Sequence, residues 1–124
     1  MSKPVVRSAA FKAVAVAGLT LPEVEATTDW SGAPVLRLRG CFMAGLASHP
    51  TAEPDSLVVR CALDDRERLI EDAADTYYVT DFYHPYPVVL ARLSQLTPDA
   101  LRDLLSVSWR MTLDKSPRRR SRTP

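Results

Sequence analysis

Residues 77–109, YYVTDFYHPYPVVLARLSQLTPDALRDLLSVSW, contain the clearest structural signals in the chain. Thr76–Phe82 is rich in β-branched and aromatic residues, which favour a strand, and the alternation puts Tyr78, Thr80 and Phe82 on one face. His84-Pro85-Tyr86-Pro87 interrupts the strand, because proline has no N–H for a sheet ladder. Val88–Leu93 is a short apolar run and predicts a second strand. The two strands are expected to form an antiparallel hairpin.

A helix follows the hairpin. Thr97 can cap its first turn, Pro98 suits the first helical position, and Asp99 complements the positive end of the helix dipole. Apolar and small residues then recur at helical spacing and predict one buried side: Leu101, Leu104, Leu105 and Ser108.

The preceding part of the chain predicts two more helices and three strands. Leu19–Thr28 has no regular pattern, and Gly40 is placed to turn a hairpin. The second helix is expected to open with a capping box at Asp64 and Glu67. The expected elements are a helix at Pro4–Ala17, strands at Val35–Arg39, Cys41–Ala47 and Leu57–Leu63, and a helix from Asp64. The order α-β-β-β-α-β-β-α predicts an α+β fold, a single compact domain with a five-stranded, mostly antiparallel sheet and helices packed on one face.

Several motifs resemble the MmcQ/YjbR-like family: Tyr78-Val79-Thr80-Asp81, Tyr86-Pro87-Val88-Val89-Leu90, Arg92-Leu93 and Ser108-Trp109-Arg110. The resemblance implies a compact α+β domain with a frataxin-like or secretion-chaperone-like fold, and it implies DNA binding, for which the family is named. It supplies no catalytic motif. Frataxin-like iron donors use an acidic first helix, but Pro4–Ala17 contains no acid, so iron handling is not expected.

Charge divides the chain into a domain at residues 1–114 and a basic tail at residues 115–124. Five of the 16 basic residues and none of the 15 acidic residues lie in the tail. Residues 1–114 therefore hold 11 basic and 15 acidic residues, a net charge of −4. No apolar run is long enough to span a membrane. The two cysteines, Cys41 and Cys61, lack a paired motif, which favours a reduced, cytoplasmic protein.

Arginines are the main candidate binding residues. Arg37, Arg39, Arg60 and Arg92 fall on expected strands, where they would form a phosphate- or carboxylate-binding patch if they share the face away from the helices. The alternative is a solvated sheet face with scattered ion pairs. In the tail, Arg118, Arg119, Arg120 and Arg122 would attract nucleic acid without sequence preference, or would only aid solubility.

Aromatic residues near the hairpin, above all Tyr83 and Tyr86, could stack on bases or seat a partner, or could belong to the core. His49 and His84 have no metal-ligand spacing, and the chain carries no nucleophile or phosphate-loop motif. We therefore expect no enzyme activity, no catalytic residue, no cofactor and no metal.

Three functional hypotheses follow. The first is a non-enzymatic domain that binds DNA through the strand arginines and the tail. The second is a protein-interaction module that seats a partner or a second copy of the chain on an exposed apolar sheet face at Val88, Leu90 and Val58. The third is a small-molecule or anion binder. DNA binding should weaken steeply with salt, whereas burial of an apolar patch should not.

Overall fold

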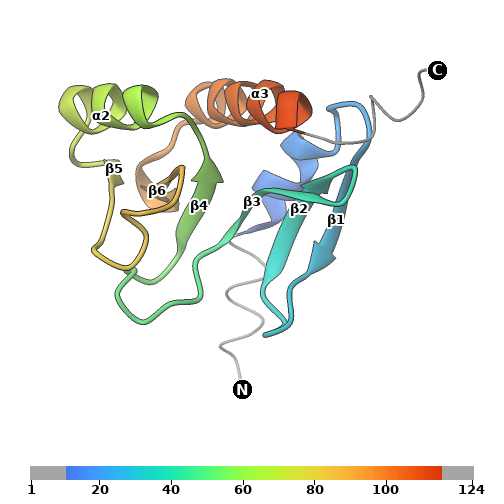
Figure 1. Ribbon diagram of the computed structural model, residues 1–124, viewed down its shortest axis with the longest axis horizontal. Helices are drawn as coiled ribbons and strands as arrows, with labels where there is room; N and C mark the ends of the chain where they lie inside the picture. Colours follow the sequence, from blue (N-terminus) through green and yellow to red (C-terminus); the bar gives the residue numbers. More distant parts are fainter. Residues whose placement is uncertain (1–10, 116–124) are drawn as a thin grey trace.

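Six antiparallel strands form one sheet in the order β1-β2-β3-β4-β6-β5 (Figure 1). The computed structural model describes residues 11–115. The strands are β1 (Val24–Thr28), β2 (Pro34–Leu38), β3 (Cys41–Leu46), β4 (Ser56–Arg60), β5 (Tyr77–Tyr78) and β6 (Val88–Arg92). Residues 11–18 are helical, and α2 (Leu63–Asp72), a short 3-10 turn η1 (Leu93–Gln95) and α3 (Pro98–Lys115) complete the fold. The α+β class is confirmed.

The sheet has one strand more than the sequence predicts. β1 lies at its edge, paired with β2, in a segment for which we expected no regular structure. Four of its five residues are exposed, so no apolar alternation marks it. The β2–β3 turn is confirmed at Gly40. Arg39 and Gly40 both have positive φ, at 54° and 83°, as a tight hairpin turn of this kind requires.

The expected strand at Thr76–Phe82 is confirmed only at Tyr77 and Tyr78. β5 contains only Tyr77 and Tyr78, paired with Ala91 and Leu90 of β6, so the alternation expected through Thr80 and Phe82 does not exist. Residues 79–87 form a loop instead (Figure 1). This loop folds over the sheet and hydrogen-bonds to residues far from it in the sequence.

Helices α2 and α3 differ in how their first turns are capped. Thr97 Oγ1 accepts a hydrogen bond from the backbone N–H of Ala100 at 3.1 Å, which confirms the predicted cap of α3. The predicted capping box of α2 is wrong, because the helix begins at Leu63 and its N-cap, Ala62, makes no side-chain bond. No helix among residues 11–115 is long and apolar enough to cross a membrane.

The main core lies between the sheet and the helices. β4 contributes Leu57 and Val59, β6 contributes Val89, and α3 contributes Leu104 and Leu105, all nearly or completely buried. Every second strand residue faces the other way, onto what we call the open face, the sheet face that does not contact α2 and α3. Because Leu57 and Val59 face the helices, Val58 and Arg60 lie on the open face.

The apolar residues of the open face are covered. Val58, Val88 and Leu90 are at most 8% exposed and form a second, smaller cluster. Tyr78 and Tyr83, with parts of the loops at residues 47–55 and 79–87, contact it. The exposed apolar surface expected at these three residues is therefore absent. What remains accessible lies at the rim of the two loops.

Candidate functional site

A pocket of about 290 Å³ opens on the open face, where β3, β4 and β6 meet the 79–87 loop. Two side chains at its rim are among the most exposed large apolar groups of the described residues: Phe82 at 44% and Tyr86 at 52%. Its lining is mainly aromatic, with one cation: Phe42, Val58, Arg60, Phe82, Tyr83, Tyr86, Pro87 and Val88.

Two arginines lie on either side of Phe42, and one of them, Arg60, lines the pocket itself. Arg37 of β2 pairs directly with Phe42 of β3. Arg60 of β4 lies next to Phe42, because its Nε donates a 2.9 Å hydrogen bond to the Phe42 carbonyl oxygen. The backbones of Arg37 and Arg60 are thus two strands apart, about 10 Å. The sequence left open whether these arginines share the face away from the helices, and the register places Arg37 and Arg60 there.

Neither of these arginines forms an ion pair with a carboxylate among residues 11–115. Glu25 is the cross-strand neighbour of Arg37 on β1, but no ion pair within 4.0 Å joins them. Arg60 uses only its Nε, in the bond to Phe42. Both guanidinium groups therefore keep hydrogen-bond donors for a ligand.

The other two strand arginines serve the fold. Arg39 lies in the β2–β3 turn and donates two hydrogen bonds to Glu23, at 2.8 and 2.6 Å, and this pairing raises the pKa of its guanidinium. Arg92 donates two bonds of 2.8 Å to Glu53 and others to the carbonyls of Ala74 and Asp75. It also lies 4.3 Å from the centre of the Tyr78 ring. The structure does not join these two arginines to Arg37 and Arg60 in one patch of unpaired cations.

Aromatic contacts hold the two loops together beside the pocket. The His49 and Phe82 rings stack at 3.6 Å between centroids, with an angle of 11° between their planes. The hydroxyl of Tyr83 accepts a bond from the backbone N–H of His49 at 3.3 Å, and burial raises the pKa of this phenol. Tyr83 therefore supports the pocket wall, while Tyr86 presents its ring to solvent.

Arg66 of α2 holds the 79–87 loop through hydrogen bonds to its backbone. Our sequence analysis did not identify this residue. It is 6% exposed, and its Nη1 donates to the carbonyl oxygens of His84, Tyr86 and Val88 at 3.1–3.2 Å. The sequence offered no signal for this role, since Arg66 follows two aspartates in the first turn of an otherwise polar helix start. A single buried cation thus shapes the backbone around Tyr86.

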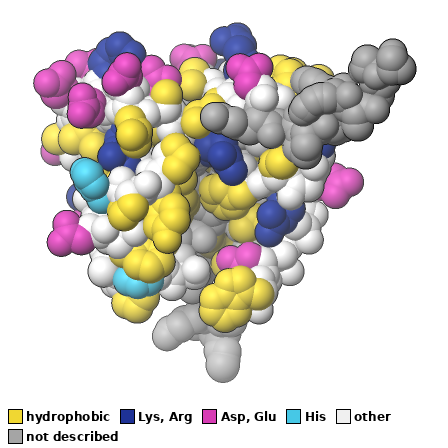
Figure 2. Space-filling model, viewed as in Figure 1, with side chains coloured by type: hydrophobic (Ala, Val, Ile, Leu, Met, Phe, Trp, Pro, Cys, Tyr) yellow, Lys and Arg dark blue, Asp and Glu magenta, His cyan; other side chains and the backbone are white. Residues whose placement is uncertain are grey.

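Acidic side chains are concentrated on the helices, on the side of the sheet opposite the open face. Eight of the 15 acidic residues belong to α2 and α3. In Figure 2 they gather over the helices at the top of the view, and a band of hydrophobic side chains runs down the surface below. A polyanion would be repelled by α2, which holds five acidic and two basic residues, and would meet unpaired arginines on the open face.

The remaining sequence candidates concern the tail arginines, metal binding and the cysteines. Arg118, Arg119, Arg120 and Arg122 lie outside the described residues. Within residues 11–115, no group of three or more His, Cys, Asp or Glu side chains is arranged to hold a metal ion. Cys61 is buried, and burial raises the pKa of its thiol to about 11.

Comparison with known proteins gives one match. The model of the YjbR family matches residues 19–111, from the turn before β1 into the last part of α3. The match includes both arginines and all the aromatic residues of the pocket. No curated protein and no solved structure gives a significant match to the chain.

Proposed function

The chain belongs to the YjbR family, and from that premise we propose that it is a non-enzymatic domain that binds single-stranded nucleic acid on the open face of its sheet. The observation that carries the proposal is the row Arg37–Phe42–Arg60. The two arginines have no carboxylate partner among the described residues and lie on either side of Phe42, so that Arg60 lines the aromatic pocket and Arg37 lies one strand beyond Phe42.

The chemistry of a nucleotide strand fits this arrangement. Arginine forks bind phosphate oxygens in pairs, and exposed aromatic rings stack on bases, with about 1–3 kcal/mol for each base. Phe82 and Tyr86 are the accessible rings. The roughly 10 Å between the two arginine backbones leaves room for at least one base between the phosphates that they contact.

A single strand is favoured over a duplex for two reasons. Bases in a duplex are stacked on one another and cannot enter an aromatic pocket, whereas unpaired bases can. In addition, α2 holds five acidic and two basic residues and α3 holds three of each, so neither presents the basic surface of a recognition helix in the major groove. We expect binding with little sequence preference, in the cytoplasm and without a cofactor.

A protein partner is the second candidate. Phe82 and Tyr86 lie 6.2 Å apart between ring centroids and are both exposed, so they could anchor an interface, including one with a second copy of the chain. The interface would then be formed by Phe82 and Tyr86. It would not be formed by Val58, Val88 and Leu90, which are covered.

The test is fluorescence anisotropy of labelled single-stranded and duplex DNA with the full chain, at about 50 and about 200 mM salt. Arg37→Ala with Arg60→Ala should weaken single-strand binding about tenfold or more. Phe82→Ala with Tyr86→Ala should do the same through lost stacking. The matched control, Arg68→Ala with Arg102→Ala, removes two exposed arginines from the helical layer and should bind nearly as wild type.

Equal losses in the arginine pair and its control would mean general charge attraction and would refute the open-face site. An absence of binding to either DNA, together with concentration-dependent self-association lost in Phe82→Ala/Tyr86→Ala, would favour the protein-interaction function.

A further inference from the structure

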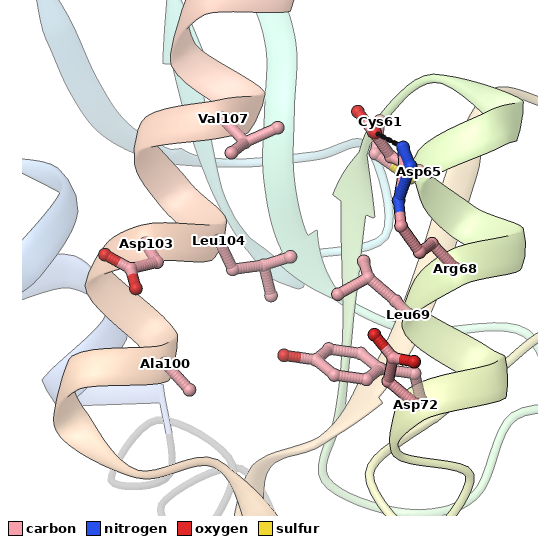
Figure 3. A pocket seen from close by; sticks show the side chains of 10 residues that line it. Cys61, Asp65, Arg68, Leu69, Asp72, Ala100, Asp103, Leu104 and Val107 are labelled. Carbon is pink, nitrogen blue, oxygen red and sulfur yellow. Dashed lines mark hydrogen bonds and ion pairs between the residues drawn. The ribbon is translucent and has the colours of Figure 1, made fainter.

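A second pocket, of about 330 Å³, lies between α2 and α3 on the layer opposite the proposed nucleic-acid site. Its floor is apolar, formed by Leu69 and Leu104 together with Cys61 and Tyr77 of the sheet layer. Figure 3 shows Val107 and Asp65 at one end of this groove and Ala100 and Asp72 at the other.

Three carboxylates stand around this apolar floor, and two of them are unpaired. Asp65 forms an ion pair with Arg68 at 2.9 Å. Asp72 and Asp103 make no side-chain hydrogen bond or ion pair with any residue of the described range 11–115. The two line the groove from different helices, and Figure 3 shows the Asp103 carboxylate on the side of α3 turned away from α2, so separate arginines would meet the two carboxylates.

Tyr77 supplies a second, independent sign that the groove takes a polar ligand. The side chain is 7% exposed and lines the groove, yet its hydroxyl has no hydrogen-bond partner among the residues that the structure describes. The hydroxyl oxygen is not one of the fully buried unpartnered atoms of residues 11–115, which are Arg39 Nη1 and Thr112 Oγ1, so it stays accessible to a ligand in the groove. A guanidinium group has five N–H donors and could bond the phenol oxygen and a carboxylate at once.

The floor and rim together match the shape of an arginine side chain. Its aliphatic stem can lie on Leu104 and Leu69 while the charged end reaches the carboxylates. The chain itself carries a segment of this chemistry directly after α3. Residues 116–124, SPRRRSRTP, hold four arginines and no acid, and they lie outside the part of the chain that the family model matches.

The segment is long enough to reach the groove. Asp103 lies 12 residues before Lys115 on α3, about 18 Å along the helix axis. An extended chain covers up to about 3.5 Å for each residue, so Arg120 reaches about 17 Å from Lys115 and Arg122 about 24 Å. Pro117 cannot continue the helix and disfavours helical backbone at Ser116, which suits a reversal of direction at this point.

We propose that the groove between α2 and α3 is the docking site of the basic segment 116–124 of the same chain, with arginine side chains held by Asp72, Asp103 and Tyr77. The inference goes beyond the proposed function and does not depend on it, since docking needs no nucleic acid. Where nucleic acid is bound, the acidic groove competes with it for the same arginines.

The experiment compares backbone amide NMR spectra of full-length chains at low salt. The first variant replaces the four tail arginines, Arg118, Arg119, Arg120 and Arg122, with glutamine. The second is Asp72→Asn with Asp103→Asn. The matched control, Glu71→Gln with Asp99→Asn, removes one charge from each of the same helices outside the groove.

Docking predicts that tail neutralisation shifts the amides of Leu69, Asp72, Ala100, Asp103 and Val107 and leaves β2 and β3 unchanged. The Asp72→Asn/Asp103→Asn chain should show tail amides with the lower heteronuclear NOE values of a free segment. The control should keep the wild-type heteronuclear NOE values. In both the wild-type chain and the control, about 500 mM salt should release the tail.

Unchanged groove amides after tail neutralisation would overturn the proposal, as would equal effects in the groove variant and its control. Groove shifts that grow with protein concentration would assign the occupant to the tail of a second copy and would overturn docking within one chain.

Discussion

Three backbone carbonyls around the 79–87 loop share a single buried nitrogen, Nη1 of Arg66. No carboxylate of residues 11–115 forms an ion pair with this side chain. The position of Tyr86, and therefore the rim of the proposed nucleic-acid pocket, depends on a contact between elements 18 to 22 residues apart in the sequence.

Arg66→Met should lower the free energy of unfolding by about 2–4 kcal/mol, because it removes three charge-assisted bonds and leaves carbonyls without donors. Urea unfolding measures the change. Arg68→Met, two residues away on the same helix and exposed, is the control and should change stability by less than about 0.5 kcal/mol. Similar unfolding midpoints for the two variants would show that the loop does not need Arg66.

Cys61 makes stability depend on pH in the alkaline range. Burial, followed by the charge of Asp65, raises the pKa of its thiol to about 11, and Arg66 offsets part of this rise. Between about pH 9 and 11 the unfolded chain has lost the thiol proton that the folded chain keeps, so stability falls as pH rises, by up to about 1.4 kcal/mol for each pH unit. Below this window the contribution is complete.

Cys61→Ala should therefore show a shallower loss of stability from pH 9 to 11 in urea unfolding. Cys41→Ala, which leaves the Cys61 thiol in place, should keep the wild-type slope. Tyr77, whose pKa is also raised by burial, acts with the same sign in every chain and does not affect the comparison. Parallel curves for wild type and Cys61→Ala would contradict the prediction.

At the scale of elements, α3 illustrates how a local signal specifies structure. Its cap, its first proline and its buried stripe are all within a few residues of one another, and all three were predicted. The helix covers β2, β3 and β4 and provides half of the groove proposed for the tail.

Thr97→Ala should destabilise the fold by about 1 kcal/mol, since the N–H of Ala100 loses its side-chain partner. Thr97→Ser keeps the hydroxyl and should remain within a few tenths of a kcal/mol of wild type. Thermal unfolding measures both. A loss of equal size in both variants would point to the missing methyl group rather than to the cap.

At the scale of the whole molecule, the two layers carry different charge. The helical layer holds most of the acidic residues (Figure 2), whereas the open face holds two arginines, Arg37 and Arg60, without ion pairs among the described residues. A net charge of −4 for residues 1–114 is thus compatible with local attraction of a polyanion.

This separation predicts a specific salt dependence. For single-stranded DNA, the slope of log affinity against log salt should fall in magnitude by about 1.4 in Arg37→Ala/Arg60→Ala and by about 2.8 when the four tail arginines become glutamine. The two changes should add if the sites act independently. Anisotropy titrations over a series of salt concentrations measure the slopes, and an unchanged slope in the first variant would exclude phosphate contacts by the sheet.

The sequence by itself determined the α+β class, α3 with its cap, the turn at Gly40 and the faces of β4 and β6. These features follow from helical or strand periodicity and from turn residues, so the information lies within about one turn or one strand of the chain. The family resemblance at residues 77–109 rested on the same region and is confirmed by the match over residues 19–111.

Only the tertiary structure decided which arginines remain available. Arg92 and Glu53 are 39 residues apart and Arg39 and Glu23 are 16 apart, so no local pattern predicts that these pairs form. The same is true of β1, which is a strand because β2 provides hydrogen-bond partners, and of the 79–87 loop, which follows Arg66 rather than its own β propensity. At these positions long-range partners overrode local conformational preference. Satisfying the hydrogen bonds of a buried backbone group or a guanidinium stabilises the fold by more than the intrinsic strand or turn propensity of a short segment does.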